Sequence, residues 1–400
     1  MTLGRPDAGA AGERGSGRAT RAIIDLDAIA ANVAAIRAHL APRTRFMAVV
    51  KANAYGHGAT MVARAAIAAG ASDLAVATLD EALALRRDGL SVPILTLSPF
   101  APAEVGAAID GGIALTVATK DGFAAVAAAV RMTSGGPLAV HVKIDTGMRR
   151  FGAPPDEALY LARRVAESSG MDLAGIFTHF AEADDPDERR THEQAACFER
   201  CLAALAAAGI RPRIVHAANS AATLRFPRYH YDLVRVGIAL YGVAPAPNVS
   251  LPSGARPALS IRSRVARVIP LDAGDRVGYG GTHVVEEPGR AALVPIGYGD
   301  GYRRALSGRG WMGLAGARAR VLGRVSMDQT VVAVPAGVMV AEGDDVVVLG
   351  DPRTGAPSVM DLARLSDTIG YEMLTGVAAR VPRQYQRAGE AVAVDDDGRD

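Results

Sequence analysis

The chain is short of cysteine, of aromatic side chains and of any excess of one charge. Its 400 residues include 2 cysteines, aromatic residues make up 5%, and the formal net charge is +2. With no long basic run, nucleic acid and anionic membrane surfaces are disfavoured as main partners. No apolar stretch reaches the roughly 18 residues that a membrane span needs. We therefore expect a soluble cytoplasmic protein with no nucleic-acid and no membrane partner.

The cysteines and the chain ends suggest little chemistry. Cys197 and Cys201 lie four residues apart in a predicted helix, and we interpret them as reduced thiols rather than as a redox pair. Residues 1–20 contain no hydrophobic signal core, so we expect a flexible N-terminal arm there. Residues 387–400 read as a polar tail.

Residues 21–250 alternate between short apolar runs and Ala-rich segments of helical length, which predicts parallel β/α units. About eight such units over roughly 200 residues favour a (β/α)8 TIM barrel over an open sheet. The predicted barrel strands are "RFMAVV", "DLAVAT", "PILTL", "IALTV", "LAVHVKID", "DLAGIFTHF", "RIVHAA" and "YDLVRVGIALYG".

The pattern changes near residue 245. The segment "VAPAPNVSLPSGARPALS" reads as a linker, and beyond it most runs alternate like half-buried strands. Residues 251–386 are therefore predicted to form a second, mainly β domain with one short helical stretch near its end. The fold class is thus α/β, a TIM barrel followed by a β domain. An early strand in "RAIIDLD" could join either domain.

The predicted barrel strands end in basic and polar residues, where barrel enzymes place their functional groups. A lysine at a strand end becomes an amine nucleophile when burial or nearby cations lower its pKa. Beside hydroxyl and backbone N–H donors for a phosphate, this set favours a lysine that binds pyridoxal phosphate. The residues are Lys51, Lys143, Asp145, Arg149, Arg150, His179, His216, Asn219, Ser220, Arg235, Gly237 and Ile238.

Each of these residues also has a plainer interpretation. A strand-end lysine can reach solvent, and buried histidines can satisfy one another or the backbone. A rival hypothesis is a metal-dependent hydrolase, but the usual paired-histidine spacings are missing. That alternative would use His57, His179, His192 and His216 with Asp145.

Residues 20 to 386 as a whole resemble the bacterial alanine racemases, which are pyridoxal phosphate enzymes of fold type III. The resemblance rests on several separated motifs, so chance agreement is negligible. They are "AVVKANAYGHG", "VKIDTGMRRFG", "THFAEAD", "HAANSAATLRFP", "VRVGIALYG", "VGYGGTH", "VPIGYGDGYRR", "GRVSMDQT" and "IGYEMLTG".

The resemblance implies a role for many of these residues and no metal ligand. Lys51 resembles the lysine that binds pyridoxal phosphate and then acts as one of two bases. Tyr279 resembles the second base, supplied by the partner subunit of a homodimer with shared active sites. Arg235 resembles the partner of the pyridine nitrogen, with His179 and His216 in its hydrogen-bond chain. The implied phosphate ligands are Tyr55, Ser220, Gly237, Ile238 and Tyr371.

The remaining implied residues concern the substrate. Arg150 and the backbone N–H of Met327 resemble groups that contact the substrate carboxylate, with Asp328 beside the latter. Lys143 resembles a lysine that is carbamylated in many members and orients Arg150. Tyr298 and Tyr371 resemble residues that narrow the entrance. Two positions depart from the pattern of many members, because Arg149 replaces a glycine and Ser326 a cysteine.

The implied activity is interconversion of L-alanine and D-alanine, supplying D-alanine for peptidoglycan. Two alternatives stay open at this point. One is a racemase for serine or for several amino acids, which pocket size would decide. The other is a non-catalytic pyridoxal phosphate carrier on the same barrel. Such carriers lack a β domain, so Tyr279 and "GRVSMDQT" count against this alternative.

Overall fold

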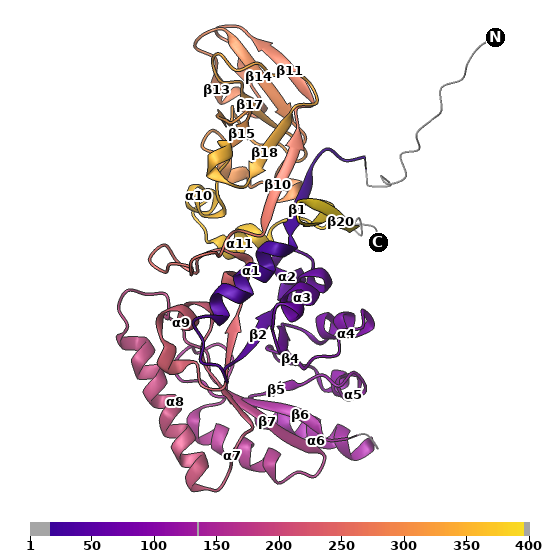
Figure 1. Cartoon of the computed structure of the whole chain (residues 1–400), viewed down its shortest axis with the longest axis vertical. Coiled ribbons are helices and arrows are strands. Elements are labelled where there is room, and N and C mark those ends of the chain that lie inside the picture. Colours follow the sequence, from indigo (N-terminus) through magenta and orange to yellow (C-terminus); the bar gives the residue numbers. More distant parts are fainter. Residues whose placement is uncertain (1–16, 134–135, 396–400) are drawn as a thin grey trace, which may run out of the picture.

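The structure is a computed structural model, and it describes residues 17–133 and 136–395. Two bodies lie one above the other, the β/α body below and the β-rich body above (Figure 1). Their separation follows the change of sequence pattern near residue 245.

The lower body is a parallel eight-stranded barrel, as predicted. Its strands follow the order β4-β3-β2-β9-β8-β7-β6-β5, and an isolated parallel bridge between Leu95 and Ala114 nearly closes the ring. Most of its strand residues are buried on both faces, which explains their continuous apolar runs. The strands are β2 (Arg45–Val49), β3 (Asp73–Val76), β4 (Ile94–Thr96), β5 (Leu115–Val117), β6 (Leu138–Lys143), β7 (Met171–Phe177), β8 (Ile214–His216) and β9 (Leu233–Val236).

Helices surround this barrel, and several of them begin with the side-chain caps that sequence rules anticipate. Thr78 and Glu81 form a capping box, and Asn219 accepts a hydrogen bond from the backbone of Ala222. The helices are α1 (Leu26–Arg37), α2 (Lys51–Tyr55), α3 (Ala59–Ala68), α4 (Leu79–Arg87), α5 (Val105–Asp110), α6 (Lys120–Met132), α7 (Pro155–Ala166), α8 (Arg189–Ala207) and α9 (Ser220–Arg225).

The upper body is mainly β, with two short helices, α10 (Val359–Leu365) and α11 (Gly370–Thr375). Its largest sheet has seven strands in the order β16-β15-β18-β10-β1-β19-β20, and β11-β14-β17 and β12-β13 form smaller sheets. The strands are β1 (Arg21–Asp25), β10 (Leu259–Arg264), β11 (Arg267–Leu271), β12 (Arg276–Val277), β13 (His283–Val284), β14 (Gly289–Val294), β15 (Trp311–Leu314), β16 (Ala317–Arg320), β17 (Thr330–Ala333), β18 (Asp345–Leu349), β19 (Arg383–Arg387) and β20 (Glu390–Asp395).

The early strand that the sequence left open, β1, joins this second sheet. It pairs antiparallel with β10 and parallel with β19, so residues 21–25 belong to the upper body and the chain enters the barrel through α1. Residues 1–16 of the predicted N-terminal arm lie outside the described residues. Thr20, the last residue of that arm, is buried, and its hydroxyl forms a hydrogen bond with the hydroxyl of Ser263. In the predicted tail, β20 pairs with β19, and residues 396–400 lie outside the described residues.

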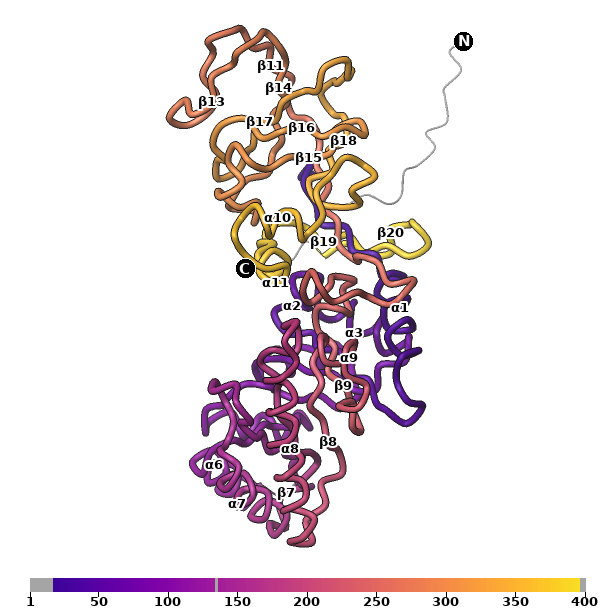
Figure 2. The backbone as a smooth tube through the Cα atoms, turned by 90° about the vertical axis from the view of Figure 1, so that its left-hand side faces the viewer, coloured from indigo at the N-terminus to yellow at the C-terminus, as the bar shows by residue number. Residues whose placement is uncertain are grey.

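The two bodies share one continuous buried cluster. In both views α11 lies beside α2, at the end of the barrel where the strands terminate (Figures 1 and 2). A Cβ on Gly56 would lie 2.4 Å from the carbonyl oxygen of Leu374, which shows how closely the two backbones approach. The second body therefore covers the strand ends near Lys51.

Candidate active site

Lys51 is separated from the end of β2 by Val50 alone and is half-buried at the end of the barrel. Burial lowers the pKa of its amine, the charge of Arg150 lowers it further, and Glu81 opposes both effects. A lysine with a lowered pKa carries a larger neutral, nucleophilic fraction at neutral pH. The position of this amine and its lowered pKa both suit an amine nucleophile.

The turn after Lys51 is left-handed over four residues that are not glycine. Ala52, Asn53, Ala54 and Tyr55 have φ between 51° and 53°, a conformation that costs roughly 1–2 kcal/mol per residue. Glu81 contributes to holding this turn, because its Oε1 accepts a hydrogen bond from the Ala52 N–H at 2.6 Å. Glu81 was not predicted as a site residue, although its capping position was readable from "TLDE".

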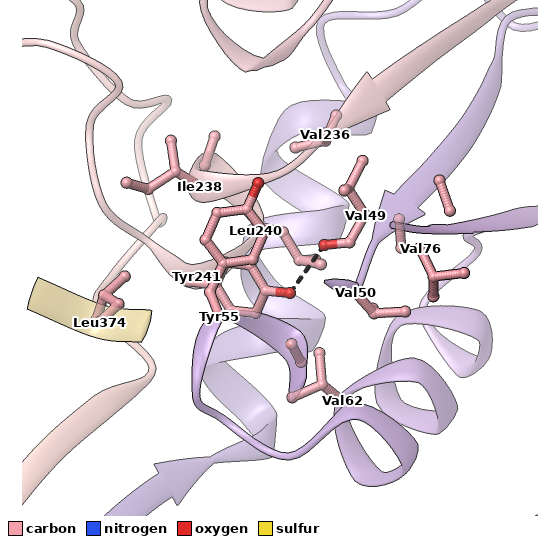
Figure 3. Packing of buried hydrophobic residues seen from close by; sticks show 14 of the residues in the cluster. Val49, Val50, Tyr55, Val62, Val76, Val236, Ile238, Leu240, Tyr241 and Leu374 are labelled. Carbon is pink, nitrogen blue, oxygen red and sulfur yellow. Dashed lines mark hydrogen bonds between the residues drawn. The ribbon is translucent and has the colours of Figure 1, made fainter. Parts of the chain in front are cut away.

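The turn returns Tyr55 to the interior, where three tyrosines of distant segments meet. The ring centroid of Tyr55 lies 4.9 Å from that of Tyr241 and 6.1 Å from that of Tyr371. Figure 3 shows the first pair, with Ile238 and Leu374 nearby and the Tyr241 hydroxyl donating to the Val49 carbonyl at 2.9 Å. Burial raises the pKa of Tyr55 to about 12, so its hydroxyl remains a hydrogen-bond donor.

A small cradle of hydroxyl and backbone groups lies against Tyr55. Gly237 follows β9, and a Cβ built there would lie 2.6 Å from the Tyr55 hydroxyl. The N–H of Gly237 donates to Ser220 Oγ at 2.9 Å. Ser220 and Ile238 are the first residues of short helices, whose first N–H groups have no partner within the helix. The structure thus brings four of the five predicted phosphate ligands together, and Tyr371 contacts the same group from the second body.

Arg235 lies buried in the barrel and joins two histidines. Its Nη1 donates to His216 Nδ1 at 2.9 Å, and its Nη2 bonds His179 Nδ1 at 3.2 Å. Nη2 also donates to the carbonyls of Thr178 and Ala217. Burial lowers the pKa of Arg235 to about 9, which still leaves the guanidinium protonated at neutral pH.

These contacts fix which ring nitrogens carry protons. Burial first, and then the charge of Arg235, holds the pKa values of His179 and His216 well below their ordinary range, so both rings are neutral. Since both Nδ1 atoms accept from Arg235, both Nε2 atoms carry hydrogen. His216 Nε2 therefore donates to His141 Nδ1, 2.9 Å away. His141, which lies two residues before Lys143 in β6, was not predicted as part of this chain of hydrogen bonds.

Lys143 and Arg150 lie close enough to Lys51 for the charges within this group to lower the pKa values of both lysines. The ammonium of Lys143 lies 5.1 Å from the ring centroid of Phe151, and burial, followed by the charges of Arg235 and Arg150, lowers its pKa to about 8. Arg150 lowers the pKa values of Lys51, Lys143 and His179, and among the described residues no such effect comes from Arg149. Arg149 has a φ of 55°, which explains why a glycine would fit there.

Four predicted residues lie exposed on the second body. Tyr279 is 70% exposed, Met327 53% and Tyr298 42%. Tyr279 begins the short helix that joins β12 to β13, and β13 lies at the end of the second body away from the barrel (Figures 1 and 2). Asp328 is exposed beside Met327 and bonds Arg380.

Two further findings bear on the alternatives. Across residues 17–133 and 136–395, no group of three or more His, Cys, Asp or Glu side chains is placed to hold a metal ion, which leaves the hydrolase hypothesis without a ligand set. None of the helices in the same ranges is both long and apolar enough to cross a membrane.

The comparisons with known proteins agree over most of the chain. A family model for the N-terminal domain of alanine racemase matches residues 24–245, and one for its C-terminal domain matches residues 258–385. Alanine racemase of Symbiobacterium thermophilum is 44% identical over 369 residues, which cover 92% of this chain and 97% of that protein. Alanine racemase of Mycolicibacterium vanbaalenii is 42% identical, covering 91% and 94% respectively.

Solved structures give the same result. Alanine racemase from Bacillus anthracis with bound L-Ala-P has a TM-score of 0.89 at 37% identity, covering 94% of this chain and 97% of that chain. Alanine racemase from Streptomyces lavendulae has a TM-score of 0.88 at 41% identity, covering 94% and 98%. The predicted barrel followed by a β domain is confirmed, and this chain belongs to the alanine racemase family.

Proposed function

We propose that this protein interconverts L-alanine and D-alanine with pyridoxal phosphate, using Lys51 and Tyr279 as two bases. The observation that carries the proposal is the Lys51 amine, half-buried with a lowered pKa at the same barrel end as a donor cradle and a fully protonated Arg235. Family membership supports the substrate, because the curated relatives named above are alanine racemases.

The residues present fit pyridoxal phosphate. Any side chain at Gly237 would fill the space beside Tyr55, and the hydroxyls of Tyr55 and Ser220 adjoin backbone N–H groups suited to a phosphate. Lys51 would hold the aldehyde carbon. When bound, the cofactor withdraws electrons from the Cα of an attached amino acid and makes its proton removable.

Arg235 would then decide the type of reaction. A guanidinium donates a hydrogen bond to the pyridine nitrogen but does not give up its proton. Beside this partner the cofactor would accept electrons less strongly than beside a carboxylic acid, so a proton lost from Cα would return quickly. Arg235 would thereby favour racemisation over transamination.

Inverting Cα requires a base on each face. Lys51 supplies one, and we propose that Tyr279 of the partner subunit supplies the other in a homodimer with shared sites. The exposure of Tyr279 supports this arrangement, since a tyrosine that is 70% exposed has surface to offer a partner. The Nε2–H of His179 would stabilise the ionised phenol by donating a hydrogen bond.

The substrate carboxylate would meet Arg150 and the backbone N–H of Met327, with Asp328 in the same wall. Tyr298 and Tyr371 would narrow the entrance, which suits a methyl side chain. Lys143 has the neutral amine fraction that reaction with carbon dioxide requires, because its pKa is lowered to about 8. The resulting carbamate would be an anion able to orient Arg150.

D-Alanine would serve peptidoglycan synthesis, and the cytoplasm is the compartment we propose. Cys197 and Cys201 are free thiols, which fits a reducing environment. The carrier alternative is not favoured, because the second family model covers residues 258–385. A racemase for serine or several amino acids is not favoured either, since the matched relatives are alanine racemases.

The test is chiral chromatography of L-alanine incubated with purified protein and pyridoxal phosphate. D-Alanine rising to a 1:1 mixture, and its loss in Lys51→Ala, is the expected result. Tyr279→Phe should retain exchange of the Cα hydrogen with deuterated water for one enantiomer only. L-Serine racemised as fast as L-alanine would contradict the substrate, and exchange of both enantiomers in Tyr279→Phe would contradict the second base.

A further inference from the structure

A buried carboxylate, Asp300, lies next to the second-body residues that the proposed site needs from the partner. Its side chain is fully buried at the end of the short helix Tyr298–Asp300. Asp300 Oδ2 accepts from the Gly297 N–H at 2.9 Å. Asp300 Oδ1 accepts from Arg380 Nε at 2.8 Å and from Arg18. Nothing in the proposed chemistry uses this group.

A carboxylate out of contact with water is costly unless charges and hydrogen bonds compensate it. Here the guanidiniums of Arg18 and Arg380 converge on Asp300, and the surplus positive charge is balanced by Asp328, which pairs with Arg380. Together these four side chains carry no net charge. These residues therefore form a salt-bridge network rather than an isolated surface ion pair.

Arg380 connects this salt-bridge network to Met327 and Asp328, which are proposed to line the substrate site. Its Nη2 donates to Asp328 Oδ1 at 2.8 Å and approaches the Met327 carbonyl at 3.5 Å. A Cβ on Gly299 would lie 2.4 Å from the same Nη2 and 3.1 Å from the Met327 carbonyl. The guanidinium is thus packed against both the Gly299 backbone and the Met327 peptide.

The peptide groups on both sides of Met327 are consequently fixed. The Ser326 carbonyl accepts from the Tyr298 N–H at 3.0 Å, and the Met327 carbonyl accepts from the Gly299 N–H at 2.8 Å. In a trans peptide the C=O and N–H groups point in opposite directions. Because the Ser326 carbonyl points toward Tyr298, the Met327 N–H of the same peptide points away from it.

We propose that Asp300 and Arg380 are positioning residues that hold the Met327 N–H for the substrate carboxylate in the partner subunit's site. This inference rests on the proposed function, in which active sites are shared. Asp300 orients Arg380 through Nε, and Arg380 holds the Met327–Asp328 segment through Nη2. Neither residue touches the reacting atoms.

The first experiment is steady-state kinetics of Arg380→Gln in the full-length holoenzyme. A misplaced N–H loses one hydrogen bond to a charged group, so KM for L-alanine should rise roughly tenfold. The kcat should stay within about twofold, because the lost contact binds substrate and transition state alike. The Kd for pyridoxal phosphate should not change.

Two further variants keep the proposal falsifiable. Arg353→Gln removes a guanidinium that is 91% exposed and paired with Asp351 in the same body, and it should leave KM unchanged. Arg380→Lys keeps one charge but cannot bridge two carboxylates, so its KM should lie between those of the wild type and Arg380→Gln. An unchanged KM in Arg380→Gln, or a fall in kcat with KM unaltered, would overturn the assignment.

Mixed dimers test whether the two subunits share their active sites, independently of the positioning role of Arg380. Lys51→Ala and Arg380→Gln chains carrying different affinity tags are co-expressed, and the mixed dimer is purified over both. If sites are shared, the working site combines Lys51 of one chain with the intact wall of the other, and KM is that of the wild type. A mixed dimer with the raised KM of Arg380→Gln would refute sharing, while the single-variant kinetics would still decide the positioning role.

Discussion

Replacement of Gly237 by alanine adds a single carbon atom, Cβ, to the proposed cofactor cradle and so tests it. The new Cβ would lie 2.6 Å from the Tyr55 hydroxyl and 3.3 Å from its Cζ. Ordinary contacts begin at roughly 3.5 Å, so the hydroxyl has to retreat by roughly 0.9 Å. Tyr55 cannot do so freely, because its ring packs against Tyr241 and Tyr371.

That displacement is enough to break a hydrogen bond. A bond of about 2.8 Å lengthened by this amount falls outside the range of protein hydrogen bonds. Hydrogen bonds to charged groups contribute about 1.5–3 kcal/mol, which corresponds to about 10- to 150-fold in an equilibrium constant. We therefore expect Gly237→Ala to weaken pyridoxal phosphate binding by that factor.

The assay is absorbance titration of cofactor-free protein with pyridoxal phosphate. Gly106→Ala is the matched control, since Gly106 lies in α5 and a Cβ there meets nothing within 4 Å. This control should bind the cofactor normally and gain roughly 0.5–1 kcal/mol in the free energy of unfolding. A Kd for Gly237→Ala within twofold of the wild type would refute the reasoning about Tyr55.

Three other predictions concern titration, tautomers and charge. Burial lowers the pKa of His57 from 6.5 to about 4, so the unfolded chain binds more protons between these values. The free energy of unfolding should fall by about 3 kcal/mol as pH drops from 6.5 to 4, and urea titrations of His57→Gln should show a smaller fall. His141→Phe leaves the His216 Nε2–H without its acceptor, and urea unfolding should show a loss of about 1–3 kcal/mol, whereas an unchanged midpoint would contradict the assigned tautomers. Arg150→Ala should raise KM for alanine at least about tenfold and Arg149→Ala should not, because Arg150 alone of the pair perturbs Lys51; equal kinetic effects would reverse that assignment.

The elements that sequence predicted well are those whose signal is local. Strand β2 is a short buried run followed by Lys51, and the rule that barrel sites lie at strand ends then points to this lysine. Arg235 and His216 were found in the same way. The periodic pattern implies a barrel, and the order of the strands around that barrel brings these side chains together.

What escaped prediction depends on contacts between distant segments. The pattern of β1 suits either sheet, and only pairing with β10 and β19 decides it. The left-handed turn at Ala52–Tyr55 contradicts local preference and exists because Glu81 and the tertiary packing hold it. Arg380 lies in an ordinary loop, and its link to Asp300 and Asp328 has no counterpart in residue spacing.

The position of β1 has a consequence for how the molecule is made. Residues 21–25 are synthesised before the barrel, yet they fill the gap between β10 and β19 in a sheet whose other strands follow the barrel in the chain. A fragment cut at the family boundary of residue 258 would lack this strand and leave two edges unpaired, so we expect it to aggregate. We therefore expect the barrel to fold during synthesis, whereas the seven-stranded sheet is complete only once β19 and β20 have been made. Once both are formed, the chain crosses between them twice, before α1 and after β9, and this double connection opposes twisting of one body against the other.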